Sequence, residues 1–472
     1  MTDINAGPNE QRTISREHLG FYHSVIIGAV YEFNIQFEPE DARYYLGALR
    51  HCVEEHPFLS ALVGDRHTDR AYYHRATTIK LAEHLLVLDR AEDGNGQTLV
   101  SIEQVLRWNL DQPFTHTVPP WRVVVLPLPR TPLGAGSCFI TFCFSHTILD
   151  GPSGVAFHRT FRSALLDPTR YDDTTVFTPP SLPFPPPFDT PSRLPISWSF
   201  LLGPLLAAVL PNFLTNALGL QAHASPVNPG TWTGTPTFFD KTTTHSNVIL
   251  RSIPAPLVTS ALRASKANGA KLTGVMHQLI TRALSKAIAT NNPDITNFAS
   301  QTAINMRRAA GIDPNEMGEY ASGVFLSHPV VHKTVYDGPL TEEDWAAARH
   351  ATERFADAAS RLSDQPIGLL RYAPSIRKWT EDKLGKARDS SYEVSNIGVF
   401  DGGDDDKIKI VDVVFAQPGM VVGCPFCFNV ASIKGGGLIY SVTWTEGALG
   451  VEDEKKLAEE VCETIREGFE RF

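Results

Sequence analysis

The sequence predicts a mixed α/β protein with two domains, and three observations support this prediction. The chain has 472 residues, which is enough for two domains that each have a core. Hydrophobic residues make up 42% of it and charged residues 20%, the usual balance of a folded globular protein. Both halves alternate helical apolar spacing with short β-branched runs, and a proline-rich stretch separates them.

The first half of the chain is expected to contain a helix, two strands and a second helix. Residues 39–56 repeat apolar side chains at helical spacing, which predicts the first helix. Residues 121–127 and 138–145 are β-branched and aromatic runs bounded by proline and glycine, which predicts strands. A helix is expected at 153–166. We assign residues 1–176 to a first domain.

A proline-rich and apolar segment, residues 177–244, is expected to connect the domains. Residues 178–195 cannot form a helix or a central strand, because their many prolines lack the backbone N–H. Residues 196–210 are nearly all apolar, but they are fewer than the roughly 20 that a membrane-spanning helix needs. A buried or surface-lying segment is therefore favoured over stable insertion, and peripheral membrane contact stays open.

Residues 245–472 are expected to form a second mixed domain. Strands are predicted at 246–252, 300–306 and 320–331, and a hairpin at 424–445 that turns at glycines 435–437. Thr341 is a predicted helix N-cap. Helices are predicted at 256–267, 272–290, 341–361, 366–386 and 452–470.

Charge and cysteine content narrow the classes of function. The net charge is -10 and no long basic run occurs, which disfavours a nucleic-acid partner. Six cysteines in so long a chain argue against a disulfide scaffold and for a reducing compartment. The N-terminal residues are polar and lack an apolar signal core, so a cytoplasmic protein is expected. No metal site, glycine-rich phosphate loop or tightly bound cofactor is predicted.

The chemistry is expected at FSHTILDGPSG, residues 144–154, which directly follows a predicted apolar strand. Among the 16 histidines only His146 has an aspartate four positions on, Asp150, and Gly151 completes an HxxxDG pattern. A neutral imidazole suits a general base that deprotonates a hydroxyl near neutral pH. Asp150 is expected to fix the loop and Gly151 to permit a sharp turn. The competing interpretation is a surface histidine followed by an aspartate helix cap.

HTILDG resembles the active-site motif of the CoA-dependent acyltransferase superfamily, to which chloramphenicol acetyltransferase belongs. Three further stretches are similar to family segments in the same order: HPFLSALV at 56–63, INMRRAAG at 304–311 and SNIGVF at 395–400. Condensation domains of peptide synthetases usually carry a second histidine where Ser145 stands. The DFGWG loop of plant BAHD enzymes is missing from residues 415–423. The closest resemblance is therefore to fungal alcohol O-acetyltransferases of secondary metabolism.

The resemblance implies two chloramphenicol-acetyltransferase-like domains with an active-site tunnel between them. It implies that His146 is the general base, and that Asp150 forms a salt bridge with Arg307. Ser395 and Asn396 are then candidates for contacts with the oxyanion or the donor. Tyr320 and Ser322 either line the tunnel or simply pack in a strand. The co-substrate is expected to be acetyl-CoA or another acyl-CoA, the acceptor a small-molecule alcohol, and the protein a monomer.

Two other functions compete with O-acyl transfer. One is a stand-alone condensation-like enzyme that takes its acyl group from a carrier protein or forms an amide. The other is a homologue that binds a ligand without catalysis, against which the intact His146, Asp150 and Gly151 count.

Overall fold

The β-branched and aromatic runs of the first half form two antiparallel strands at the centre of a sheet. They are β7 (Trp121–Leu128) and β8 (Gly136–Ser145), and every residue of β8 is buried. Within the described part of the chain this sheet has five strands, in the order β15-β2-β8-β7-β6. The other three are β2 (Ser24–Phe33), β6 (Leu85–Val87) and β15 (Ile408–Ala416).

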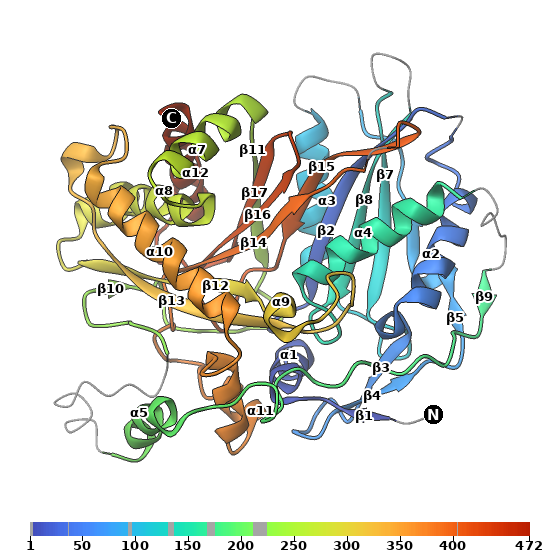
Figure 1. Cartoon of the computed structure of the whole chain (residues 1–472), viewed down its shortest axis with the longest axis horizontal. Coiled ribbons are helices and arrows are strands. Elements are labelled where there is room, and N and C mark those ends of the chain that lie inside the picture. Colours follow the sequence, from blue (N-terminus) through green and yellow to red (C-terminus); the bar gives the residue numbers. More distant parts are fainter. Residues whose placement is uncertain are drawn as a thin grey trace.

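The architecture is that of a computed structural model of the chain (Figure 1). It describes residues 3–35, 37–92, 97–130, 136–167, 175–210, 224–403 and 405–472. Residues 168–174 of the predicted first domain and residues 211–223 of the predicted connecting segment lie outside the described residues.

Helices cover both faces of the first sheet. Successive side chains of β2 point to opposite faces, so they enter two different cores. Ile27 and Ala29 belong to the core beneath α2 (Arg43–Glu55) and α4 (Gly151–Leu165). Ile26 and Val30 belong to a second core that includes residues of α3 (Gln97–Leu110). Figure 1 shows α4 lying across the front of the sheet, with α2 beside it and α3 behind.

The second half forms a larger sheet in the order β10-β12-β14-β16-β17-β11, with β13 paired to β12. β14 runs parallel to both β12 and β16, whereas β16 and β17 form the hairpin predicted at 424–445. The bounds are β10 (Thr231–Trp232), β11 (Ser246–Ile253), β12 (Asn297–Asn305), β13 (Ala321–Pro329), β14 (Tyr392–Phe400), β16 (Phe426–Ile433) and β17 (Leu438–Thr445).

Four long helices pack on the second half: α7 (Ala255–Ala267), α8 (Leu272–Ala287), α10 (Glu342–Ser360) and α12 (Glu454–Glu470). The predicted N-cap of α10 is confirmed, since the Thr341 side chain accepts a hydrogen bond from the Asp344 backbone. The single helix predicted at 366–386 is wrong. It is a 3₁₀ helix at Pro366–Tyr372 followed by α11 (Ile376–Glu381), because Pro374 interrupts the helical hydrogen bonds.

One strand of residues 245–472 crosses the proposed domain boundary, because β15 pairs with β2 of the first sheet. It also stays in contact with β16 and β17, so it links the two sheets. The connecting segment also contributes structure, since β10 pairs in parallel with β12. The two halves are thus joined by an exchanged strand as well as by the connection between them.

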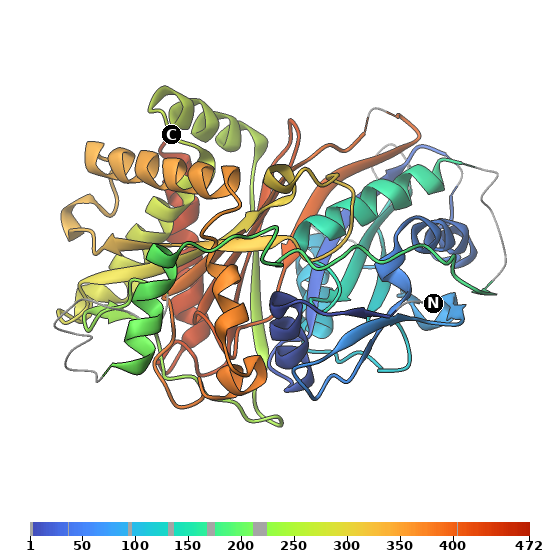
Figure 2. The ribbon, with the colours of Figure 1, turned by 60° about the horizontal axis from the view of Figure 1, so that its bottom comes forward.

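The proline-rich residues 178–195 contain no helix or strand, as predicted, and the chain there runs across the front of both halves (Figure 2). The apolar residues after them form α5 (Trp198–Val209) on the surface. Trp198 is 78% exposed, whereas Leu201 is buried. Among the described residues, no helix combines the length and the apolar character needed to cross a membrane.

The N-terminal residues form a helix that was not predicted, α1 (Pro8–His18). Pro8 occupies its first turn, and the Glu10 side chain accepts a hydrogen bond from the Gly7 backbone at 2.6 Å. Asp189 of the connecting segment accepts a second one from the Asn9 backbone, also at 2.6 Å. The connecting segment therefore holds the start of α1 at the junction of the two halves (Figure 2).

Candidate functional site

His146 lies at the end of β8, in the loop that leads into α4. This loop is fixed on both sides of the histidine. The Thr147 backbone N–H donates to the Ser145 hydroxyl at 3.2 Å, and the Tyr73 hydroxyl donates to the Thr147 carbonyl at 2.5 Å. The Asp150 backbone N–H donates to the carbonyl of Gly318, from the second half of the chain, at 3.1 Å.

Asp150 and Arg307 form a two-pronged ion pair between the halves. Nη1 and Nη2 of Arg307 donate to Oδ2 and Oδ1 of Asp150 at 2.7 and 2.8 Å. Both side chains are 2% exposed. Burial raises the pKa of Asp150, but the charge and hydrogen bonds of Arg307 outweigh burial and hold the pKa below its usual range. The structure thus brings together the two residues that the resemblance paired.

The same carboxylate also caps α4, which was the competing interpretation of Asp150. The Ser153 backbone and hydroxyl donate to Oδ1 at 3.1 and 2.7 Å, and the Tyr320 backbone donates to Oδ2 at 3.0 Å. Asp150 is therefore a helix cap and an ion-pair partner at once. Its hydrogen bonds are all directed away from His146, towards α4 and the loop between β12 and β13.

The His146 ring faces a carboxylate that the sequence did not reveal. Its Nδ1 lies 2.7 Å from Oε2 of Glu319, whose side chain is 2% exposed. The pair is close enough for an ion pair, although its alignment is not that of a straight hydrogen bond. Neither atom has another hydrogen-bond partner among the described residues. A carboxylate beside Nδ1 favours the neutral tautomer that carries its proton there, which has a free Nε2.

Opposing effects set the basicity of His146. Burial lowers the pKa of the imidazole, and the charges of Arg12 and Arg16 lower it further. The negative charge of the nearby Glu319 carboxylate raises the pKa and leaves it above its usual value. The side chain is 21% exposed, so the ring remains accessible to a substrate.

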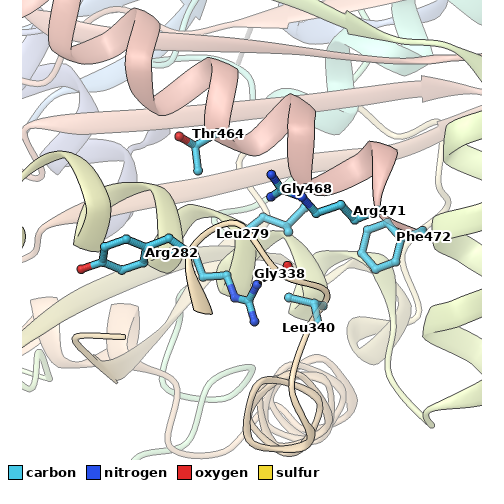
Figure 3. A pocket seen from close by; sticks show the side chains of 9 residues that line it. Leu279, Arg282, Gly338, Leu340, Thr464, Gly468, Arg471 and Phe472 are labelled. Carbon is cyan, nitrogen blue, oxygen red and sulfur yellow. Dashed lines mark hydrogen bonds between the residues drawn. The ribbon is translucent and has the colours of Figure 1, made fainter. Parts of the chain in front are cut away.

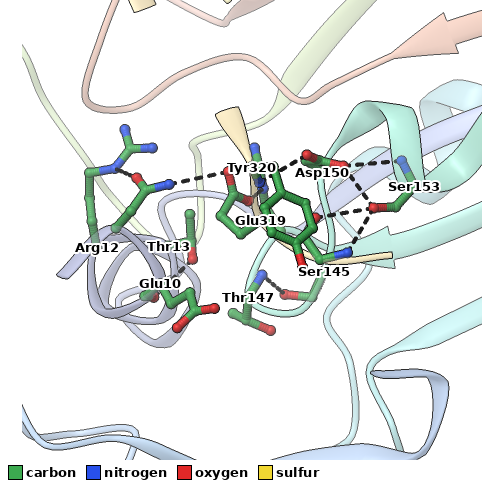
Figure 4. A network of polar contacts seen from close by, with 12 residues as sticks. Glu10, Arg12, Thr13, Ser145, Thr147, Asp150, Ser153, Glu319 and Tyr320 are labelled. Atoms are coloured by element: carbon green, nitrogen blue, oxygen red, sulfur yellow. Dashed lines mark hydrogen bonds and ion pairs between the residues drawn. The ribbon is translucent and has the colours of Figure 1, made fainter. Parts of the chain in front are cut away.

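Glu319 is held by α1, as Figure 4 shows for the residues between α1 and the motif loop. Nδ2 of Asn9 donates to Oε1 of Glu319 at 3.2 Å. Burial raises the pKa of the neighbouring Glu10 to about 8, and the charges of Asp189 and Glu319 contribute to the rise. Glu10 is therefore largely uncharged at neutral pH, and Glu319 is the acid that contacts the histidine.

Gly151 has a different purpose from the sharp turn expected of it. It is the first residue of α4, and its backbone is outside the left-handed region. A Cβ at this position would lie 3.1 Å from Cγ2 of Ile397 in β14. A larger residue would have to displace the Ile397 side chain, so glycine suits the close approach of the motif loop to the SNIGVF strand.

Two of the four other predicted contact residues, Asn396 and Tyr320, have structural partners. The Asn396 side chain donates to Thr273 at 3.1 Å and accepts from the Gly398 backbone at 2.8 Å, beside the bulge in β14. The Tyr320 hydroxyl donates to Glu316 at 2.5 Å, and its ring lies against the Arg307 guanidinium. Ser322 is buried in β13, and its hydroxyl has no partner among the described residues. Ser395 is half-buried in β14.

Three further polar residues, Arg12, Arg16 and Tyr22, act on or contact His146 and were not predicted. Arg12 and Arg16 come from α1, Tyr22 follows that helix, and its ring centroid is 5.8 Å from that of His146. The Tyr22 hydroxyl donates to Gln417 at 2.8 Å. The proline and capping glutamate at the start of α1 were the available signal for this helix, but nothing local indicates that it meets the motif.

One pocket lies far from the motif in sequence and a second lies next to it. The pocket in Figure 3 lies between α8 and α12 and contains no residue of the motif. The second pocket reaches Thr147, the neighbour of His146, and is therefore the one adjacent to the candidate site. It is lined by Glu17, Leu62, Val63, Arg66, Phe114, Thr115, His116, Val118, Pro120 and Thr147.

Comparisons with known sequences point to one family. The sequence profile described as alcohol acetyltransferase matches residues 88–467. An uncharacterised protein of Schizosaccharomyces pombe is 25% identical over 94% of this chain and 92% of its own. The probable alcohol acetyltransferase crmB of Aspergillus fumigatus is 22% identical over 95% of this chain and 96% of its own.

Comparisons with solved structures support the fold. The trichothecene 15-O-acetyltransferase TRI3 of Fusarium sporotrichioides has a TM-score of 0.66 at 10% identity, covering 99% of this chain and 95% of that one. The starter condensation domain of the rhizomide synthetase RzmA has a TM-score of 0.60 at 12% identity, covering 98% and 93%. At identities this low, the structural matches show a shared two-lobed α/β fold, and they say nothing about substrates.

Asp150→Asn tests the ion pair as the anchor of the loop. The substitution leaves Arg307 buried without a counter-charge, so the free energy of unfolding should fall by about 3–5 kcal/mol. Urea unfolding measures this. Asp382→Asn removes an exposed partner of Lys378 and should cost less than about 1 kcal/mol. Equal costs for the two variants contradict the anchoring role.

Proposed function

Because the chain belongs to the alcohol acetyltransferase family and is an acyltransferase, we propose that His146 is the base with which it acetylates a small-molecule alcohol. The observation that carries the proposal is the contact between His146 Nδ1 and Glu319, 2.7 Å long, at a loop fixed by Asp150 and Arg307. It fixes the ring so that Nε2 is the free basic atom.

The reaction follows from this geometry. Nε2 of His146 takes the proton of the acceptor hydroxyl as its oxygen attacks the thioester carbonyl. The resulting imidazolium is stabilised by the Glu319 carboxylate. When the tetrahedral intermediate collapses, the carbon–sulfur bond breaks and the imidazolium returns its proton to the departing thiolate. The products are an ester and a free thiol, and no covalent enzyme intermediate is needed.

The rest of the site keeps His146 in place. Asp150 and Arg307 act through the loop and not on the substrate, because their charged atoms are directed at each other. We propose acetyl-CoA as the thioester, with Ser395 of the half-buried β14 as the remaining candidate for a donor contact. The enzyme is proposed to act as a monomer, since both halves of its site come from one chain. A cytoplasmic location is proposed from its few cysteines.

Acetyl transfer is tested by mass spectrometry of the purified protein incubated with acetyl-CoA and a panel of alcohols. A product heavier by one acetyl group is expected with the wild type. His146→Ala should lower the rate by about 10²- to 10⁴-fold, the usual contribution of a general base. His332→Ala, an exposed histidine outside the site, is the control and should retain the wild-type rate.

Two outcomes would contradict the proposal. Full activity of the His146→Ala variant would show that His146 is not the general base. Acetyl transfer from a carrier-protein thioester but not from acetyl-CoA indicates a condensation-like enzyme instead.

Glu319→Gln tests the partner of the base through the pH profile of kcat/KM. Only neutral His146 accepts a proton, so the rate falls as the pH drops through the pKa of His146. Glu319 raises that pKa. Without its charge the acidic limb should move to lower pH, and kcat should fall because the imidazolium loses its counter-charge.

Glu393→Gln is the matched control for this profile. Glu393 is also buried, but it accepts its hydrogen bond from Gln417 at 2.9 Å and not from His146. The acidic limb should move less in this variant than in Glu319→Gln. An unchanged limb in Glu319→Gln would show that the carboxylate does not act on the histidine.

A further inference from the structure

Two arginines of α1 lie beside His146 and have no acidic partner. Arg12 and Arg16 are one helical turn apart, so they lie on the same side of α1. Among the residues that the structure describes, neither guanidinium has a carboxylate oxygen within the 4.0 Å of an ion pair. Arginine is almost never buried unless it is paired, so this arrangement calls for an explanation.

The contacts of Arg16 leave much of its guanidinium unsatisfied. The residue is 7% exposed, and its Nε has no hydrogen-bond partner. Among the described residues, its side chain donates one long hydrogen bond, from Nη2 to the Val422 carbonyl at 3.5 Å. The guanidinium carbon lies 4.6 Å from the centre of the Tyr22 ring. A cation–π contact of this kind replaces only part of the hydration that burial removes.

Both arginines are connected to His146 through short chains of contacts. Nε of Arg12 donates to Oδ1 of Asn9 at 3.1 Å, and Asn9 donates to the same Glu319 carboxylate that faces His146. The Tyr22 ring contacts both Arg16 and His146: the Arg16 guanidinium carbon is 4.6 Å from its centre, and the His146 ring centroid is 5.8 Å away. Arg16 is therefore connected to the proposed base through one residue and Arg12 through two, Asn9 and Glu319.

The carboxyl groups of this region do not offset the two charges. Glu319 faces His146. Glu10 accepts from the Gly7 backbone, and burial raises its pKa to about 8. Glu393 accepts from Gln417, and its burial likewise raises its pKa above the usual range, against the opposing charges of Arg16 and Arg12. Among the described residues, none of these three carboxyl groups forms an ion pair with Arg12 or Arg16, so both guanidinium groups keep donors for a further acceptor.

We propose that Arg12 and Arg16 bind a carboxylate of the acceptor, so that the alcohol that this enzyme acetylates is a hydroxy acid. The inference rests on the proposed function and specifies its acceptor. The planar guanidinium groups suit a carboxylate, whose two oxygens accept charge-assisted hydrogen bonds. The proposal requires that an acceptor with its carboxylate at α1 reaches Nε2 of His146 with its hydroxyl.

The test uses pairs of molecules that share a hydroxyl and differ in charge. Lactate, salicylate and mandelate are each compared with their methyl esters on the full-length protein. Binding is measured by the shift in melting temperature, and acetyl transfer by the release of CoA from acetyl-CoA. At least one acid should bind more tightly than its ester and be acetylated with a higher kcat/KM.

Arg16→Gln should abolish that preference. It should lower kcat/KM for the acid by about 10- to 100-fold, the value of a lost charge-assisted hydrogen bond, and leave kcat/KM for the ester within a few-fold. Arg12→Gln gives a second variant in case Arg16→Gln does not fold. Arg263→Gln removes an exposed arginine on α7 and should retain the preference for the acid.

Each other outcome has a definite meaning. If no acid binds more tightly than its ester, the proposal is wrong. If Arg16→Gln lowers kcat for acid and ester alike, the arginines stabilise the reaction's oxyanion and the proposal is also wrong. If acids and esters are acetylated with the same kcat/KM, the carboxylate site is wrong and the proposed acetyltransferase function stands. Failure of every compound to accept an acetyl group, while acids still bind through Arg16, would count against the proposed function and leave the carboxylate site standing.

Discussion

The buried ion pair between Asp150 and Arg307 is the interaction on which the rest of the site depends. It joins the loop after β8 to the loop between β12 and β13, which come from different halves of the chain. The pair is not a source of large net stability, because desolvation offsets most of its attraction. Its effect is positional. Two hydrogen bonds, each between one guanidinium nitrogen and one carboxylate oxygen, fix the two loops relative to each other. His146 and Glu319 meet as a result.

One short loop therefore performs two tasks. Arg307 anchors the motif through Asp150, and Glu319 from the same loop faces the histidine. The third component is α1, which holds Glu319 through Asn9 and adds two positive charges nearby. The opposing effects of these groups on the imidazole explain how a largely buried histidine stays basic. The exchange of β15 into the first sheet fixes the halves further, so that the site does not rely on the ion pair alone.

Much of the local structure was predictable, because it depends on neighbouring residues. The strand before His146, the cap at Asp150 and the hairpin around Gly435 follow from short patterns. The partner Arg307 came from the family resemblance. Glu319 was not predicted, because no spacing rule relates it to His146 before the chain folds. Nor does the run at 408–416 indicate which sheet it joins. Two errors were avoidable: Pro374 marks the break before α11, and Pro8 with Glu10 marks the start of α1.

The central claim is that Glu319 holds the proton of neutral His146 on Nδ1 and leaves Nε2 free to accept one. Long-range proton–nitrogen NMR correlations of the imidazole measure this directly, with His146→Gln identifying the signals. At a pH above the titration of the ring, the Nδ1–H tautomer should predominate, with Nε2 at the shift of an unprotonated nitrogen. A predominant Nε2–H tautomer would contradict the account, because the atom that is proposed to take the acceptor's proton would already carry one.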